Sequence, residues 1–309
     1  MPRVIAPAEA SPAIDLDTFL GEVERAGFDP RCEDSFASLG PALGQLGADR
    51  AFLGDRLVDL LTRDGAGQGA SNPYGAQVVM LHRGDGWFVR ANIWPAAHEA
   101  AMRASGPRPF FYGVPHDHNF SFLTVGYFGP GYWSDYWDYD HGAVAGFTGE
   151  PAGLRFVERS RLSPGRILLY RAHRDVHSQH PPDSVSVSLN LMQQAPGQGW
   201  RDQYRFDVET GTVDGIVSAQ AAEGLVALLP ALGGAEGMDL LDRFAKGHPS
   251  QRIRFGCIEA LAGAAADFDA TVDIYARATR ASDPFVSGMA RHRLGQIEQG
   301  AAWRRKAAP

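Results

Sequence analysis

Hydrophobic positions along the chain follow three successive patterns, which predict helices, then strands, then helices again. In the N-terminal part the apolar residues recur at helical spacing. The predicted helices there are 14–26, 34–46 and 49–63, behind a flexible lead at 1–12. From Tyr74 the apolar period falls to two, as in half-buried strands. From residue 218 onward the spacing is helical again, and alanine, leucine and glycine become more frequent.

Turn sequences divide the β region into short strands. Arg83-Gly84-Asp85-Gly86 joins the first two strands, and Pro164-Gly165 precedes another. The predicted strands are 77–82, 87–94, 116–126, 154–162, 167–170 and 185–191, with a hairpin at 204–208 and 212–217 that closes the β domain. The segment 127–140 is rich in aromatic residues, which form either the core or the wall of a pocket.

Histidines form the most informative chemical cluster of the sequence. Eight of the ten histidines fall between residues 82 and 180. His116 and His118 are one residue apart in a predicted strand, so both imidazoles lie on one face, with Cβ atoms about 7 Å apart. Two imidazoles at this spacing can bind one metal ion. Three later histidines follow the Pro-Gly turn as candidates for a third ligand: His173, His177 and His180.

Composition excludes several classes of partner. The chain has 309 residues and a net charge of −7, without a basic block, so nucleic acid is not an expected partner. Its two cysteines are far apart in sequence, which favours a reducing cytoplasm over a disulfide framework. The N-terminus lacks the pattern of a signal peptide, and no apolar run reaches the ~18 residues of a membrane span.

The C-terminal part contains two similar segments about 35 residues apart, 248–261 and 283–297. Each has a proline at a helix start and an apolar stripe after it, which resembles HEAT-type helical repeats. Two units are fewer than a free-standing solenoid needs, so we expect this part to pack on the β domain or on a second subunit, as in a homodimer. The predicted domains are 1–66, 67–217 and 218–309.

The β region resembles the thiol dioxygenase branch of the cupins, the cysteine dioxygenase type, over residues 74–191. The matching features are Tyr74, the hairpin Gly84-Asp85-Gly86 with Phe88, Trp94, His116-Asp117-His118, Ser121, a third histidine and Ser186-Val187-Ser188-Leu189. The resemblance implies an α+β chain with N-terminal helices on a cupin barrel (a double-stranded β-helix or jelly roll), followed by the all-α HEAT-like domain. It also implies ferrous iron held by three neutral imidazoles.

Carried over residue by residue, the resemblance makes His116 and His118 the first two metal ligands. It favours His177 as the third, because this histidine lies twelve residues after Gly165, with His173 and His180 as alternatives. Asp117 lies between two ligands and is expected to be structural. Copper, manganese and zinc also occur at three-histidine sites, so the metal stays open.

The sequence departs from the thiol dioxygenase pattern at the positions that handle cysteine. Ala76 stands where the family has its substrate-binding arginine, and Leu123 where it has a crosslinking cysteine. Of the outer serine–histidine–tyrosine triad only Ser188 remains. Free cysteine is therefore not the expected substrate. Arg90 and Arg171 are candidates for the missing cationic contact.

Three hypotheses follow from these observations. The first is an Fe(II)-dependent oxygenase that uses O2 on an amino-acid-like molecule or on a residue of a peptide or carrier, with Tyr74, Arg90 and Ser188 as its catalytic residues. The second is a non-redox isomerase, lyase or hydrolase with zinc or manganese. The third is a binding protein whose helical repeats act over a non-catalytic cupin.

Overall fold

The computed structural model of the chain describes residues 1–7, 12–62 and 77–307. The chain divides into two compact units. The first unit is Met1–Tyr139 with Leu154–Gln198, and the second is Asp140–Gly153 with Gly199–Pro309. Across the described ranges, no helix has the length and apolar character to cross a membrane.

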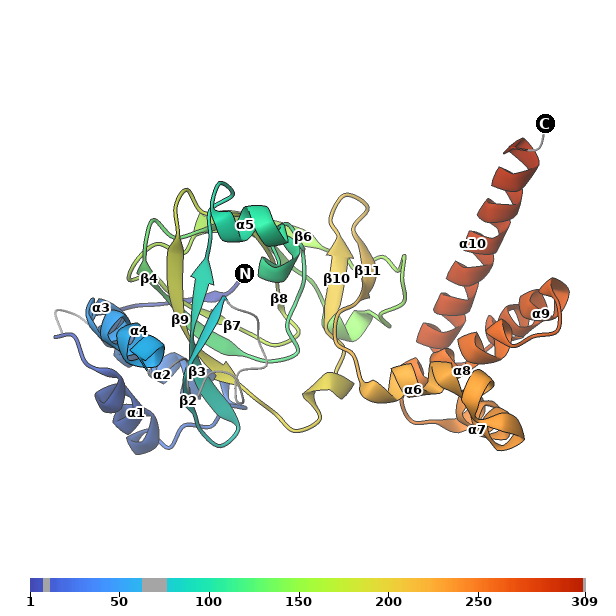
Figure 1. Cartoon of the computed structure of the whole chain (residues 1–309), viewed down its shortest axis with the longest axis horizontal. Coiled ribbons are helices and arrows are strands. Elements are labelled where there is room, and N and C mark those ends of the chain that lie inside the picture. Colours follow the sequence, from blue (N-terminus) through green and yellow to red (C-terminus); the bar gives the residue numbers. More distant parts are fainter. Residues whose placement is uncertain (8–11, 63–76, 308–309) are drawn as a thin grey trace. The chain divides into compact units, whose positions relative to one another are not determined.

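Four helices open the first unit, as the helical spacing predicts (Figure 1). They are α1 (Leu16–Arg25), α2 (Glu33–Ser38), α3 (Gly40–Ala48) and α4 (Phe52–Thr62). The segment 34–46, expected to be one helix, is two helices with Leu39 between them. Pro41 is the reason, because proline lacks an N–H donor and is tolerated only in the first turn of a helix, where it lies in α3.

Two antiparallel sheets form the body of the first unit. The six-stranded sheet has the order β1-β7-β4-β9-β3-β2, and the three-stranded sheet has the order β6-β5-β8. The strands are β1 (Arg3–Ile5), β2 (Val78–Arg83), β3 (Trp87–Trp94), β4 (Phe122–Phe128), β5 (Trp133–Asp138), β6 (Arg155–Arg161), β7 (Ile167–Tyr170), β8 (Asp175–Gln179) and β9 (Ser186–Gln193). This mixture of helices and antiparallel sheets is consistent with the expected cupin architecture.

The six-stranded sheet buries both of its faces. One face packs against the helices, where Leu123, Val125 and Leu189 meet Phe19 and Leu43 in one apolar cluster. The other face packs against the three-stranded sheet through a second cluster of aromatic and aliphatic side chains. That cluster consists of Trp94, Phe110, Tyr112, Tyr132, Tyr136, Leu162, Leu168 and Tyr170. The alternation of side chains along each strand therefore separates a helix-facing core from an interior between the sheets.

The N-terminal lead, predicted to be flexible, instead contributes strand β1 to the edge of the six-stranded sheet. Arg3, Val4 and Ile5 pair with Leu169, Leu168 and Ile167 of β7. An edge strand exposes a row of unpaired backbone N–H and C=O groups. Another segment of the chain can form hydrogen bonds with these groups whatever its own side chains are. Three residues carry too little hydrophobic pattern to predict such a strand from sequence.

The second unit contains a hairpin and five helices. They are β10 (Tyr204–Asp207), β11 (Thr212–Ile216), α6 (Ala221–Leu232), α7 (Gly234–Gly247), α8 (Gln251–Gly263), α9 (Phe268–Ala278) and α10 (Pro284–Ala307). The hairpin forms a two-stranded sheet of its own and belongs to the second unit, and the first unit ends at Gln198. A two-stranded ribbon buries little surface alone, and Ile216 packs against the helical cluster of the second unit.

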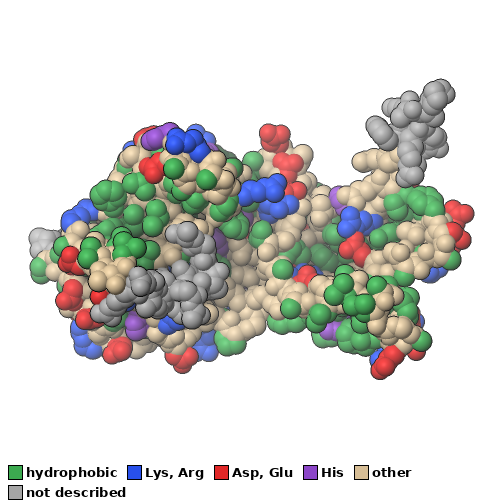
Figure 2. Space-filling model, viewed as in Figure 1, with side chains coloured by type: hydrophobic (Ala, Val, Ile, Leu, Met, Phe, Trp, Pro, Cys, Tyr) green, Lys and Arg blue, Asp and Glu red, His purple; other side chains and the backbone are tan. Residues whose placement is uncertain are grey.

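Helix α8 lies in the middle of the helical part of this unit. Its Ile253 and Cys257 pack with Val226 of α6 and Leu241 of α7. Its Phe255, Ile258 and Ala262 pack in a separate cluster with α9 and α10. By contrast, α6 leaves Leu225, Leu228 and Leu232 exposed, and hydrophobic side chains gather over α6 and α7 on the face shown in Figure 2.

Candidate metal centre

His116 and His118 lie in an extended segment that precedes β4, rather than on a regular strand as predicted. The segment makes one isolated bridge, in which His116 and His177 exchange backbone hydrogen bonds of 3.0 and 2.9 Å. The chain bends at Asn119 and Phe120 before β4 begins at Phe122. His116 and His118 still point to the same side, although they are not in a regularly paired strand, because the backbone stays extended between them.

His177 lies at the centre of β8, in which all five residues are buried. Strand β8 pairs with β5, and His177 is opposite Tyr136 in that ladder. The backbone pair between His116 and His177 therefore ties the histidine-containing segment to the three-stranded sheet. Two segments separated by about sixty residues of sequence meet at this point.

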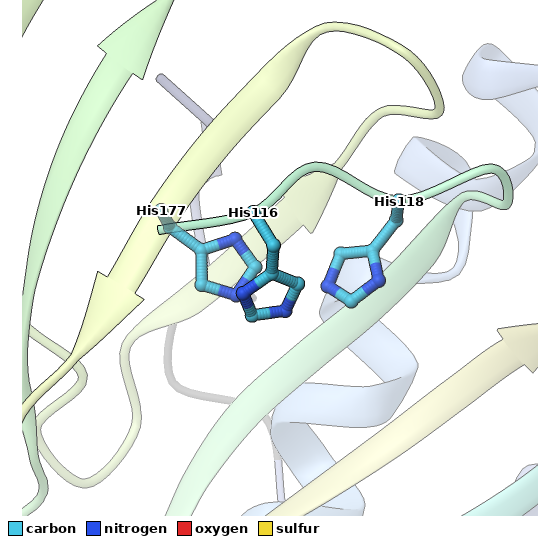
Figure 3. Close-up of side chains that lie close together, drawn as sticks. All are labelled: His116, His118 and His177. Atoms are coloured by element: carbon cyan, nitrogen blue, oxygen red, sulfur yellow. The ribbon is translucent and has the colours of Figure 1, made fainter. Parts of the chain in front are cut away.

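The three imidazoles of His116, His118 and His177 face one another between the sheets (Figure 3). Ring centroids are 4.9 Å apart for His116 and His118, 4.5 Å for His116 and His177, and 5.0 Å for His118 and His177. One candidate ligand nitrogen of each residue lies within 4.8 Å of the other two. In this group the described part of the chain places no carboxylate.

Burial keeps all three imidazoles neutral. It lowers the pKa of His116, although a hydrogen bond to the Val114 carbonyl and the charge of Asp117 partly offset this. Burial lowers the pKa of His118 further, with additional contributions from His116, His177 and the positive charge of Arg90. Burial and His116 likewise hold the pKa of His177 well below its ordinary value. Neutral imidazoles are the form that binds metals, so the cluster needs no proton loss near neutral pH.

The tautomer of His116 is set by the backbone. Its Nδ1 lies 2.8 Å from the carbonyl oxygen of Val114, to which it donates a hydrogen bond. The proton is therefore on Nδ1, and the lone pair of Nε2 is available as a ligand. A ring nitrogen that donates to a carbonyl is the usual support of a metal-binding histidine.

The two alternative third ligands, His173 and His180, lie beside carboxylates outside this group. Nδ1 of His173 is 3.7 Å from Asp117 Oδ2, and Nε2 of His180 is 2.8 Å from Asp135 Oδ2. Asp117 also accepts a hydrogen bond of 2.5 Å from the Tyr139 hydroxyl, consistent with the structural role expected for it. The geometry therefore brings His177, and neither neighbour, to His116 and His118.

Tyrosines from both sheets lie beside His177. The ring of Tyr170 is 4.8 Å from that of His177, and its hydroxyl is 2.9 Å from the hydroxyl of Tyr136. Burial raises the pKa of Tyr136, and it raises those of Tyr170 and Tyr132 well above the ordinary value. These phenols are therefore neutral hydrogen-bond donors.

The aromatic segment 127–140 has some rings in the core and others at the surface. Tyr132 and Tyr136 belong to the core between the sheets, and Tyr136 lies 6.4 Å from His177 by ring centroids. Trp133 is exposed on the other face, and Trp137 contacts Phe156 of β6 edge-on. Strand alternation separates the inward tyrosines from the outward tryptophans.

The structure describes two of the three predicted catalytic residues, Arg90 and Ser188. Tyr74, like Ala76, lies outside the described residues. Arg90 is on β3, opposite Asn190 of β9, and its charge acts on His118 and Tyr132. Ser188 is buried, and its hydroxyl accepts a hydrogen bond of 3.0 Å from the Trp94 indole.

The structure also gives the surroundings of Arg171 and Leu123. Arg171 binds Asp175 through both of its carboxylate oxygens, at 2.9 and 2.6 Å, so its role is in the loop before β8 rather than toward a substrate. Leu123 belongs to the core under the helices. A side chain at 123 therefore points away from the imidazoles, whereas the neighbouring Phe122 lies on the other face of β4 and contacts His118 edge-on.

Sequence reasoning missed Gln179, which lies two residues after His177 on β8. Its side chain is buried, and its amide nitrogen is 2.9 Å from Nε2 of His177. The spacing that drew attention to His116 and His118 applies equally to a histidine and a glutamine on one strand. That period would have found Gln179 if β8 had been predicted as a strand.

Comparison with known proteins gives no family assignment. No protein-family model matches the chain, and no curated protein matches it. Among solved structures, a chain from crystal structures of the DMSP lyases RdDddP and RnDddQII has 14% identity and a TM-score of 0.23, covering 41% of this chain and 50% of its own length. The match therefore spans half the length of that protein.

Two further solved structures are similar at the same level. A mannose-6-phosphate isomerase-like protein from Ralstonia eutropha JMP134 has 16% identity and a TM-score of 0.21, covering 41% of this chain and 94% of its own. The DMSP lyase DddQ from Ruegeria pomeroyi DSS-3 has 12% identity and a TM-score of 0.23, covering 63% and 79%. Likeness at this level carries no conclusion about activity.

Proposed function

We propose that the chain is a metal-dependent enzyme whose centre is formed by His116, His118 and His177, and that it is an Fe(II)-dependent oxygenase of small molecules. The observation that carries the proposal is the group of three neutral imidazoles, two buried and His118 half-buried, that face one point between two sheets. The resemblance of residues 74–191 to thiol dioxygenases favours iron among the metals that imidazoles bind.

The structure offers a direct test of fit for a metal ion. Oε1 of Gln179, whose amide nitrogen is 2.9 Å from His177, is buried without a hydrogen-bond partner. Orphaned buried polar atoms are uncommon, and an ion or other group that is absent from the chain is one of their standard explanations. With three neutral donors, the residues present fit a divalent cation.

The residues around the centre have separable roles. The three imidazoles would hold the ion, and bound iron would supply one-electron chemistry with O2. Arg90 places a positive charge near His118, which favours an anionic group on the substrate. Tyr136 and Tyr170 stay protonated and donate hydrogen bonds rather than acting as bases. The aromatic cluster between the sheets limits access of water.

The substrate that we propose is an amino-acid-like molecule or a residue of a peptide or carrier, together with O2. Free cysteine is excluded from the proposal because Ala76 stands where the thiol dioxygenases have their substrate-binding arginine. Arg90 on β3 is the candidate for that contact, and Ser188 supports the interior through Trp94.

A second candidate is a non-redox lyase or isomerase at the same centre. The paired hydroxyls of Tyr136 and Tyr170 beside His177 favour it, because neutral phenols are the proton donors that such reactions use. A divalent ion such as zinc or manganese would then act as a Lewis acid.

One experiment separates the two candidates. The protein is purified without a histidine tag, its metal content is measured, and the metal-free chain is loaded with Fe(II) under anaerobic conditions. We expect the iron protein to bind nitric oxide, an O2 surrogate, with an electron paramagnetic resonance signal. A protein that purifies with zinc, and whose iron form neither binds nitric oxide nor consumes O2, would instead be the non-redox enzyme.

The remaining proposals concern the second unit and the location of the protein. We infer that α8 and α10, which carry the two similar sequence segments, belong to a HEAT-like repeat, and that the exposed leucines of α6 serve a homodimer. A cytoplasmic location fits the free thiols of Cys32 and Cys257.

A further inference from the structure

Gln179 shares the inward face of β8 with His177, because residues two apart on a strand point the same way. The glutamine side chain is 7% exposed, so water does not satisfy its polar atoms. Its amide nitrogen is 2.9 Å from Nε2 of His177 and donates a hydrogen bond to the ring lone pair. That lone pair is the one through which the imidazole would bind a metal.

This arrangement leaves one buried atom without a partner, Oε1 of Gln179. Exchanging the oxygen and nitrogen of the Gln179 amide would also leave a buried atom without a hydrogen-bond partner. Nε2 of His177 would then carry the proton, and Nδ1 would be a buried acceptor without a donor. An unsatisfied buried polar group lowers the stability of the folded chain. In either orientation, the protein atoms alone cannot satisfy the pair.

We propose that Gln179 is the fourth protein residue of the metal centre, with its carboxamide oxygen as the donor atom. The inference rests on the metal-binding part of the proposed function. A cation held by Nε2 of His177 replaces the amide hydrogen at that lone pair. The same cation gives Oε1 of Gln179 the partner that it lacks.

A glutamine at this position also explains the charge of the centre. The described residues place no carboxylate with the three histidines, and a carboxamide adds a donor without adding charge. A bound divalent ion therefore keeps its full positive charge. Because a carbonyl oxygen is a hard donor, the set of three nitrogens and one oxygen suits Fe(II), Mn(II) or Zn(II) better than Cu(I).

Titration of the metal-free protein with Co(II), followed by its visible absorption, tests the assignment. Gln179→Leu removes the donor at nearly constant volume, and we expect a rise in the Co(II) Kd of at least about tenfold and an altered absorption spectrum. Gln179→Glu retains an oxygen donor and adds charge, so we expect a Kd equal to or lower than that of wild type. Ser178→Ala on the opposite face of β8 is the matched control, with an unchanged Kd and spectrum.

The opposite results are equally clear. A wild-type Kd and spectrum in Gln179→Leu would overturn the proposal, and so would a lower Kd, which would mean that the amide only competes with the metal. If Gln179→Leu does not fold by circular dichroism, the Glu variant decides, and a Co(II) Kd higher than that of wild type overturns the assignment. A wild-type chain that binds no Co(II) contradicts the metal centre itself, a result distinct from the others.

Discussion

At the scale of single residues, the centre is made by burial as much as by residue type. The chain has ten histidines, but three of them are enclosed together between the sheets. His173 and His180 are one strand or loop away and have carboxylate neighbours instead. Burial lowers the pKa of the three clustered imidazoles, which favours the neutral form that binds metals.

Replacement of the clustered histidines should remove bound metal. We expect His116→Ala, His118→Ala and His177→Ala each to lose most of the metal, because each deletes one of three donors. Metal content is measured by mass spectrometry on protein without an affinity tag. Circular dichroism establishes that each variant is folded.

The matched controls for these variants are His173→Ala and His180→Ala. Both should keep metal near the wild-type level, because their imidazoles contact Asp117 and Asp135. Full metal content in His177→Ala together with loss in either control would assign the third ligand to that neighbour.

The stability of the metal-free protein should depend on pH through the same residues. Burial lowers the pKa of His118 well below the ordinary value of 6.5, so the folded chain stays neutral where the unfolded chain takes up a proton. Above pH 6.5 both states are neutral, and His118 contributes no slope. Below pH 6.5 the unfolded state binds more protons, so the free energy of unfolding falls, by about 1.4 kcal/mol for each unit of pKa difference.

Urea denaturation at several pH values measures this slope. His118→Gln removes the titrating group, and its free energy of unfolding should fall less steeply than that of wild type as the pH drops from 6.5. Equal slopes in the two proteins would show that His118 is not held neutral by burial.

At the scale of elements, the position of β8 depends on the loop that precedes it. Arg171 binds the carboxylate of Asp175 through its side chain and donates its backbone N–H to the same group at 2.8 Å. Asp175 has no exposed side-chain surface, and the pair raises the pKa of Arg171. Since Asp175 begins β8 two residues before His177, this ion pair holds the third histidine in place.

Removal of the Arg171 side chain should therefore affect both stability and the metal. For Arg171→Leu we expect a loss of about 1.5–3 kcal/mol in the free energy of unfolding, because the Asp175 carboxylate remains buried with fewer donors. Weaker Co(II) binding should accompany it. The exposed pair of Arg205 and Asp214 provides the control, and Arg205→Leu should cost less than about 1 kcal/mol and leave Co(II) binding unchanged.

Equal losses of unfolding free energy in Arg171→Leu and Arg205→Leu would show that the loop before β8 does not hold this strand in place. Unchanged Co(II) binding in a destabilised Arg171→Leu would limit the ion pair to a role in stability.

At the scale of the whole molecule, each unit has its own core. The apolar clusters of the first unit lie under its helices and between its sheets. Those of the second unit lie on the two sides of α8. The three histidines belong entirely to the first unit. Metal binding and the stability of the helical unit should therefore be separable.

A substitution that creates a cavity in the helical core tests whether metal binding is independent of the stability of the second unit. Leu241 is fully buried between α7 and α8, so Leu241→Ala should destabilise the second unit by about 2–5 kcal/mol. We expect an earlier thermal transition by differential scanning calorimetry, with the Co(II) Kd unchanged at a temperature below that transition. A Kd that rises together with the loss of stability would show that the helical unit supports the metal centre.

The sequence alone determined the features that depend on local pattern. The period of two placed a strand at 87–94 and another at 167–170, where β3 and β7 lie, and the period of helices placed the helical parts. The spacing of His116 and His118 put two imidazoles on one side of an extended chain, and this holds although the segment is not a regular strand. Such features follow from backbone geometry over a few residues.

The tertiary structure decided which distant residues meet. His177 was only one of three candidates until the backbone pair with His116 placed β8 beside the histidine-containing segment. Strand β1 and the partnerless Oε1 of Gln179 carry no local signal, because they depend on which edge and which interior the packed sheets create. Sheet pairing joins segments through backbone groups that all residues share, so side-chain spacing alone does not decide which strands pair or which later histidine meets His116 and His118.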